Sequence, residues 1–134
     1  MDTKSAREHD RSWIFRIRSP LSYPLDDGHE VVVHARTTER LIAVRDLLDR
    51  GARSVVGDLA RLDETLDVAE QANAIGRFDA VVHNAGVFEG PAVLPVNVVA
   101  PYALTARILR PPRLIYLSSG LHRGGRLGHA VDRA

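Results

Sequence analysis

The chain has 134 residues, which is enough for one hydrophobic core but not for two. Hydrophobic residues make up 45% of it and charged residues 26%, a composition typical of a soluble globular protein and not of a disordered chain. The net charge of +1 argues against a nucleic-acid partner, and the absence of cysteine excludes disulfides, thiolate zinc sites and cysteine nucleophiles.

No stretch of the sequence predicts a targeting signal or a membrane span. The first ten residues are charged and lack the apolar run of a secretory signal. The longest stretch without charge, residues 90–106, contains three prolines and an asparagine, which argues against a transmembrane helix. We therefore expect a cytoplasmic protein without a membrane partner.

The middle of the chain alternates short apolar runs with segments of helical periodicity. Such alternation predicts parallel βαβ units, and the runs are apolar throughout, as expected where helices cover both faces of a sheet. The predicted strands are residues 30–34, 54–57, 79–83 and 114–117, and the predicted helices are residues 38–50, 62–75 and 96–109. The second of these helices is expected to bury Leu62, Leu66, Ala69 and Ala72.

The two ends do not share this rhythm. Residues 13–17 form one candidate strand, but the short connection from it to Glu30 contains Pro20 and Pro24, which disfavour a crossover helix. The last residues, 121–134, are rich in glycine and arginine and have no periodicity. We interpret them as a solvated basic tail, because no aromatic residues alternate with the arginines as they do in many nucleic-acid sites.

Five short motifs occur in order, each at the position of a predicted strand end or helix. The motifs are Gly28–Arg36, Gly57-Asp58-Leu59, His83-Asn84-Ala85-Gly86, Asn97–Tyr102 and Leu117-Ser118-Ser119-Gly120. A single motif of three residues is weak, but five in register with the predicted elements are specific. Together they resemble the short-chain dehydrogenase/reductase family, the tyrosine-dependent Rossmann oxidoreductases, over residues 28–126.

The resemblance implies a fold and an activity. It implies a partial Rossmann-type doubly wound parallel sheet, a three-layer α/β/α structure that is incomplete at both ends. Residues 1–28 would replace the family's first βα unit, residues 29–120 would form an NAD(P)-binding core, and residues 121–134 would be an irregular tail. The implied activity is that of an oxidoreductase acting on a small carbonyl or alcohol substrate.

Residues just past the strand ends are the candidates for cofactor binding, because ligands of open α/β sheets lie there. No acid occurs among residues 34–37, and Arg36 suits a ribose 2′-phosphate, so we expect NADP(H) in preference to NAD(H). The alternative for Arg36 is a solvated side chain. The resemblance implies that Asp58 and Leu59 flank the adenine and that Asn84, Ala85 and Gly86 line the ribose. A helix cap or a turn residue is the alternative for Asp58.

Two further residues are candidates for catalysis. Pro101 has no amide hydrogen, so it leaves the carbonyl of Asn97 available to a water, and the family is held to use such a water in a proton relay. The alternative is a plain kinked helix. Ser119 matches the serine that bonds the substrate carbonyl in the family. The six histidines show no metal-binding spacing, so we predict no metal site.

The sequence departs from the family in two places. It lacks the glycine-rich turn that holds the pyrophosphate, and none of its tyrosines is followed by lysine at the fourth position, since the only lysine is Lys4. A truncated or frame-shifted gene product is one explanation. Whether the chain is an enzyme stays open, and the alternatives are a non-catalytic nucleotide-binding or partner-binding module and a remnant without a ligand. Unless residues 13–17 fill the central strand position, we also expect marginal stability or self-association.

Overall fold

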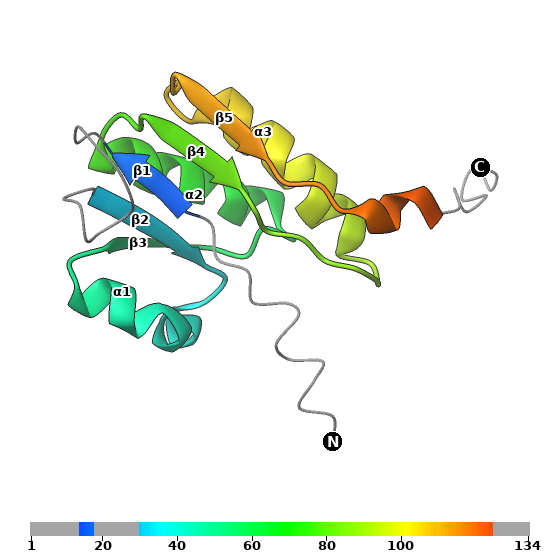
Figure 1. The fold of residues 1–134 in the computed structure, drawn as a ribbon, viewed down its shortest axis with the longest axis horizontal. Coiled ribbons are helices and arrows are strands. Elements are labelled where there is room, and N and C mark those ends of the chain that lie inside the picture. The colour runs from blue at the N-terminus through cyan, green and yellow to red at the C-terminus, as the bar shows by residue number, and fades with distance from the viewer. Residues whose placement is uncertain (1–13, 18–29, 125–134) are drawn as a thin grey trace.

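A computed structural model describes residues 14–17 and 30–124 of the chain. Its centre is one five-stranded sheet with the order β3-β2-β1-β4-β5 (Figure 1). β2 pairs with β3 and β4 with β5 in parallel, whereas β1 is antiparallel to both of its neighbours. The strands are β1 (Ile14–Ile17), β2 (Glu30–Ala35), β3 (Arg53–Val56), β4 (Ala80–His83) and β5 (Arg113–Tyr116).

The Rossmann-type arrangement is confirmed, with one difference from the predicted sheet, because β1 runs against the other four strands. Two parallel strands need a crossover connection of a dozen or more residues, usually a helix, whereas antiparallel strands need none. Residues 18–29 are at the lower limit of that length, and Pro20 and Pro24 among them disfavour such a helix. β1 also fills the central position, so β2 and β4 do not present open edges beside it. Open strand edges at the centre of the sheet are therefore no reason to expect marginal stability or self-association. Self-association stays a prediction.

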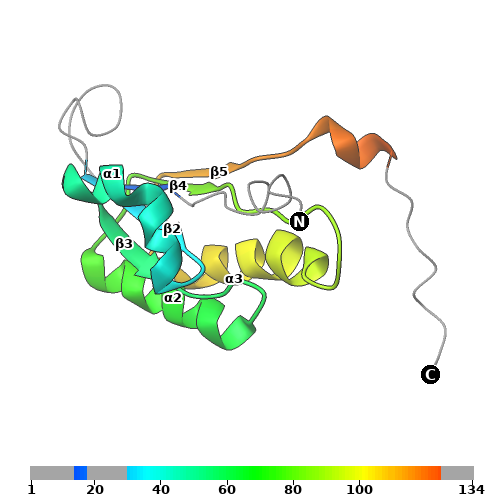
Figure 2. The same cartoon turned by 90° about the horizontal axis from the view of Figure 1, so that it is seen from below.

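Helices cover the sheet unequally on its two faces (Figure 2). One face carries α2 (Leu62–Ile75) and α3 (Ala100–Arg107), and the other carries a 3-10 helix (Thr38–Val44) continuing into α1 (Arg45–Asp49) beside β2. The larger core cluster lies under α2 and α3. It includes Val32, Val55, Val68, Phe78, Val81, Ala100 and Leu104. A smaller cluster of Val31, Val33 and Ala52 packs against Val44, Leu47 and Leu48 on the α1 side.

The predicted helices are present, but their details differ from expectation. α2 has the predicted bounds and buries Thr65, Val68, Ala69 and Ala72. Of the other two residues predicted to be buried, Leu66 is only half-buried, and Leu62, at the first position of the helix, is 53% exposed. The segment predicted as one helix over residues 38–50 is a 3-10 helix followed by one short α-helical piece, and no side chain caps its start. The predicted helix over residues 96–109 begins as a π-helical turn, Pro95–Val99, and ends at Arg107.

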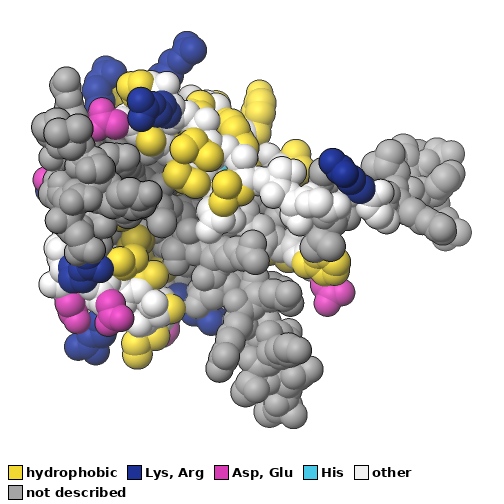
Figure 3. Space-filling view, viewed as in Figure 1, with side chains coloured by type: hydrophobic (Ala, Val, Ile, Leu, Met, Phe, Trp, Pro, Cys, Tyr) yellow, Lys and Arg dark blue, Asp and Glu magenta, His cyan; other side chains and the backbone are white. Residues whose placement is uncertain are grey.

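On the α1 side, none of the described helices covers the sheet face over β4 and β5. Leu114 packs against the larger core cluster, so the next residue, Ile115, points to the opposite face. Ile115 is 42% exposed and Leu117 is 57% exposed. Figure 3 shows apolar side chains gathered over these strands. Among residues 14–17 and 30–124, no helix is both long and apolar enough to cross a membrane.

Candidate functional site

The carboxyl ends of β2, β3, β4 and β5 meet at one edge of the sheet, because all four strands run in the same direction. The residues that directly follow these strands form what we call the carboxyl-end rim: residues 36–37, 57–59, 84–87 and 117–119. Every cofactor-binding candidate from the sequence lies on this rim, and so does Ser119. Asn97 reaches the rim from the π-helical turn ahead of α3.

On the β2–β3 side of the rim, Arg36 is exposed and Asp58 opens a tight turn. The Asp58 carboxylate Oδ1 accepts a hydrogen bond from the Ala60 amide at 2.9 Å, and its main-chain carbonyl accepts one from the Arg61 amide at 3.0 Å. Asp58 therefore has the turn-forming role that the sequence left open as an alternative. This role occupies one carboxylate oxygen and leaves the residue at the rim.

The side chain of Leu59 belongs to the core. It is 4% exposed and packs with the cluster under α2. Its neighbour in the turn, Asp58, is only partly buried. Only the main chain of Leu59 is thus available at the rim, and a contact between its side chain and a bound adenine has no support in the geometry.

On the β4 side, the loop after the strand is held by Asn97. The Val87 amide donates to Asn97 Oδ1 at 2.8 Å, and Asn97 Nδ2 donates to the Val87 carbonyl, also at 2.8 Å. Sequence reasoning missed this contact, since Pro101 draws attention to the main-chain carbonyl of Asn97 and not to its side chain. The asparagine therefore fixes the loop that carries Asn84, Ala85 and Gly86.

Gly86 is not required by the protein's own packing. Among the described residues, a Cβ at this position would meet Asn97 Oδ1 alone, at an ordinary contact distance of 3.7 Å. Gly57 is different, because a Cβ there would lie 2.6 Å from Val68 Cγ2 and 3.0 Å from the Glu64 carbonyl oxygen. The close approach of a ligand to Gly86 therefore remains a prediction, whereas Gly57 has a packing reason.

The helix around Asn97 is locally wider than an α-helix. The Ala100 amide bonds the carbonyl of Pro95, five residues back. Pro101 has no amide to offer to the Asn97 carbonyl, so a regular α-helical ladder is interrupted there. The structure thus agrees with the sequence argument on the helix. A water on the Asn97 carbonyl remains a prediction.

A cluster that the sequence analysis missed lies behind the rim. The rings of His83 and Tyr116 stack with centroids 4.7 Å apart, and Thr105 Oγ1 lies 2.5 Å from the Tyr116 hydroxyl and 3.4 Å from His83 Nε2. Burial lowers the pKa of His83 to about 4. Paired strands β4 and β5 place the two rings side by side, and α3 supplies the threonine. The signal available in the sequence was two polar residues at the last positions of neighbouring strands.

The β5 side of the rim carries Ser119, which is exposed and follows the strand by three residues. A short 3-10 helix, Gly120–Gly124, comes next and extends past the edge of the sheet (Figures 1 and 2). Ser119 and Asn97 thus come from different elements that border the same edge. Arg36 lies beyond the central strand on the β2 side.

The central position of the rim is shaped by the direction of β1. Ile14, the first residue of β1, pairs with Val33 and Val82, so the amino end of this strand faces the rim. The carboxyl end of β1, at Ile17, therefore lies at the opposite edge. Among the described residues, the turn after the first strand, where the family holds the pyrophosphate, has no counterpart at this rim.

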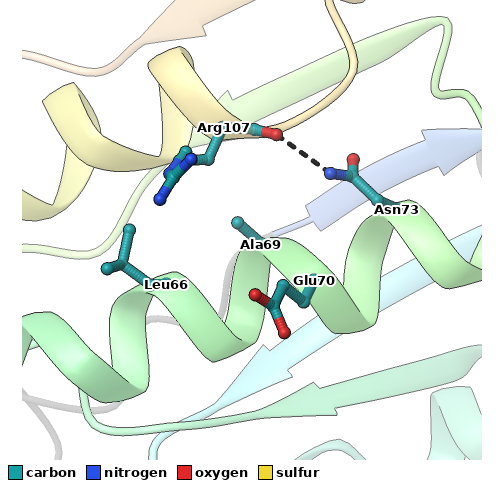
Figure 4. A pocket seen from close by; sticks show the side chains of 5 residues that line it. All are labelled: Leu66, Ala69, Glu70, Asn73 and Arg107. Atoms are coloured by element: carbon teal, nitrogen blue, oxygen red, sulfur yellow. Dashed lines mark hydrogen bonds between the residues drawn. The ribbon is translucent and has the colours of Figure 1, made fainter.

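Other features of the described residues lie away from the rim. Within residues 14–17 and 30–124, no group of three or more potential metal ligands comes together. A shallow pocket between α2 and α3 is lined by Leu66, Ala69, Glu70, Asn73 and Arg107 (Figure 4). Asn73 Nδ2 donates to the Arg107 carbonyl at 2.9 Å, and Asn73 Oδ1 accepts from the Leu109 amide at 2.8 Å, so this asparagine fastens the end of α3.

Comparison with known proteins finds sequence relatives that are named as oxidoreductases or short-chain dehydrogenases. No protein-family model matches the chain. An uncharacterized oxidoreductase of Emericella nidulans is 39% identical over 113 residues, which cover 75% of this chain and 44% of the relative. Short-chain dehydrogenases of Penicillium rubens and Gibberella zeae are each 42% identical, and they cover 74% and 73% of this chain. The chain spans less than half the length of these three relatives.

Solved structures of the same kind are similar in fold. A metagenomic short-chain oxidoreductase in complex with NADP superposes with a TM-score of 0.53 at 30% identity, over 66% of this chain and 50% of that one. A blue fluorescent protein from a metagenomic library in complex with NADPH gives a TM-score of 0.56 at 26% identity, over 69% of this chain and 47% of that one.

Proposed function

Because the part of this chain that its relatives match belongs to the short-chain dehydrogenase/reductase family, we propose that its carboxyl-end rim binds NADP(H). The observation that carries the proposal is the position of Arg36, exposed at the end of β2 beside the Asp58 turn. In Rossmann folds this is where the adenosine ribose lies. Both solved relatives named above were determined with NADP or NADPH.

The choice of NADP(H) over NAD(H) follows from charge. An acid after the second strand would bond the 2′-hydroxyl of NAD, whereas an arginine there pairs with the 2′-phosphate of NADP. Residues 34–37 include Arg36 and no acid. A charge-assisted contact of this type contributes about 1.5–3 kcal/mol, which corresponds to a preference of at least about tenfold.

The nicotinamide end would lie on the β4–β5 side of the rim. Asn84, Ala85 and Gly86 would line the ribose there, with the loop held by Asn97, and Ser119 would hydrogen-bond the oxygen of a small carbonyl or alcohol substrate. A bound dinucleotide would carry the hydride at this end. The residues of the chain would orient the cofactor and polarise the carbonyl, but the sequence has no Tyr-x-x-x-Lys to donate the proton.

The residues fit the two ends of the cofactor better than its middle. The described part of the chain holds no glycine-rich turn at the rim, and β1 enters from the wrong direction to supply one. Pyrophosphate binding therefore lacks its usual anchor, so we expect weak affinity. The same observation, with the missing Tyr-x-x-x-Lys, favours a second candidate function: a module that binds the nucleotide without catalysis.

Calorimetric titration with NADPH tests the proposal. The Arg36→Ala variant should lose at least about tenfold in affinity for NADPH and little for NADH. Arg53→Ala is the matched control, because Arg53 is an exposed arginine at the opposite end of the neighbouring strand. If wild-type protein binds neither dinucleotide, or if both variants bind NADPH equally well, the proposal is wrong.

A further inference from the structure

One peptide unit at the rim is held from two sides. The carbonyl of Gly57 lies 2.7 Å from His34 Nε2, and the amide of Asp58, the other half of the same peptide unit, donates to Glu64 Oε2 at 2.6 Å. His34 belongs to β2 and Glu64 to α2. The peptide plane through which the chain leaves β3 is therefore fixed by two separate elements.

The same glycine also completes the pairing of β2 with β3. Its amide donates to the Ala35 carbonyl at 3.1 Å, one residue before Arg36. Both main-chain groups of Gly57 are thus bonded to β2, the carbonyl through the His34 ring and the amide through the strand. As a result, the positions of Arg36 and Asp58 relative to each other depend on these contacts.

The contact with Gly57 requires a proton on Nε2 of the His34 ring. A carbonyl oxygen only accepts hydrogen bonds, so Nε2 carries the proton and donates. Burial lowers the pKa of His34, against the hydrogen bond to Gly57 and the charge of Asp58, both of which raise it. His34 is 5% exposed and follows three valines in β2. A buried strand position of this kind is usually filled by an aliphatic side chain.

We propose that His34 is a positioning residue for the dinucleotide: by holding the Gly57–Asp58 peptide, it keeps the adenosine-binding part of the rim in its binding geometry. The inference rests on the proposed function. His34 itself does not contact the cofactor. By this contact His34 restricts the conformations of the Asp58 turn before the dinucleotide binds. Binding then does not have to offset the entropy lost when the turn becomes ordered.

Three substitutions separate this role from packing. His34→Leu fills a similar volume with an apolar side chain and loses the hydrogen-bond donor. His34→Gln places an amide nitrogen about where Nε2 lies, and His34→Asn places it about where Nδ1 lies, which is too short to reach the Gly57 carbonyl. The amide variants are a matched pair, because they differ only in the reach of the same group.

The experiment is calorimetric titration of wild-type protein and the three variants with NADPH and with NADH, at a temperature where thermal unfolding shows each of them folded. His34→Leu and His34→Asn should weaken both dinucleotides by about the same factor, roughly five- to tenfold, because the adenosine part is common to both. His34→Gln should bind within about twofold of wild type. Arg36→Ala, in contrast, should weaken NADPH alone.

The outcomes distinguish the two proposals. Absence of binding by wild-type protein overturns the proposed function and this inference with it. Wild-type binding with His34→Asn equal to wild type, or with His34→Gln as weak as His34→Asn, overturns the inference alone. If His34→Leu does not fold, the pair of amide variants decides.

Discussion

The side-chain amide of Asn97 makes both of its hydrogen bonds to the main chain of Val87, donating to the carbonyl and accepting from the amide, each at 2.8 Å. One side chain thus does for this loop what a neighbouring strand does in a sheet. Since Asn84, Ala85 and Gly86 immediately precede Val87, the position of the loop at the rim depends on the helix that carries Asn97.

Loss of this contact should destabilise the protein. Asn97→Ala removes two hydrogen bonds, and we expect the free energy of unfolding to fall by about 1–2 kcal/mol, because the site is open to water that replaces part of what is lost. Asn97→Asp keeps an acceptor for the Val87 amide but sets a carboxylate oxygen against the Val87 carbonyl oxygen, so it should lose at least as much. Urea unfolding at pH 7 measures both. Equal stability of Asn97→Ala and wild type would show that the contact does not hold the loop.

Two glycines of the rim should respond differently to substitution. Gly57→Ala places a Cβ 2.6 Å from Val68 Cγ2 and 3.0 Å from a main-chain oxygen, so we expect a loss of about 1–3 kcal/mol in unfolding free energy. Gly86→Ala meets nothing closer than 3.7 Å and should leave stability nearly unchanged. The same unfolding assay compares them, and a larger loss in Gly86→Ala than in Gly57→Ala would contradict the packing described for the rim.

Buried His83 should make stability depend on pH. Its pKa is lowered to about 4 by burial, whereas an unfolded histidine titrates near 6.5. Between these values the unfolded chain binds a proton that the folded chain does not, so stability is full above pH 6.5 and falls as the pH approaches 4, by about 3 kcal/mol.

The variant that isolates this effect is His83→Gln, which cannot titrate. Unfolding curves at pH 7.5, 6.0 and 5.0 should converge more in the variant than in wild type. His34, whose pKa is also lowered by burial, contributes to the slope that remains. A variant with the full wild-type pH dependence would show that His83 is not the group responsible.

The sequence predicts the periodic parts of the fold better than the contacts between them. α2 is predicted with its bounds, because apolar residues recur at helical spacing and Gly76 ends the helix. The direction of β1 does not follow from its four residues, three of them apolar, since main-chain pairing is possible in either direction. It follows from the short connection to β2, which the sequence shows.

The candidate site shows the same division. The rim is predictable, because the carboxyl ends of parallel strands meet at one edge. The burial of Leu59 and the stacking of His83 on Tyr116 are not predictable in this way. The burial of Leu59 depends on which side of its turn faces α2, and the stacking depends on the register of β4 against β5. The spacing of apolar residues in the sequence predicts neither of them.

We expect no hydride transfer by this chain. Reduction of a ketone needs a proton donor, and a phenol with a pKa of about 10 must be activated to serve near neutral pH. None of the three tyrosines has a lysine four residues later, and such acid–base groups contribute about 10²–10⁴ in rate. NADPH with a panel of carbonyl compounds should show no oxidation above the protein-free rate. Turnover that disappears in Ser119→Ala would refute this expectation.

The central claim, that NADP(H) lies on the carboxyl-end rim with its 2′-phosphate at Arg36, is tested most directly by amide NMR spectra recorded during titration with NADPH and with NADH. The account predicts that both ligands shift the signals of Asp58 and Gly86, and that the difference between the two ligands is largest at Arg36 and its neighbour Thr37. Shifts confined to the opposite edge of the sheet or to the pocket between α2 and α3, or no shifts at all, would contradict it.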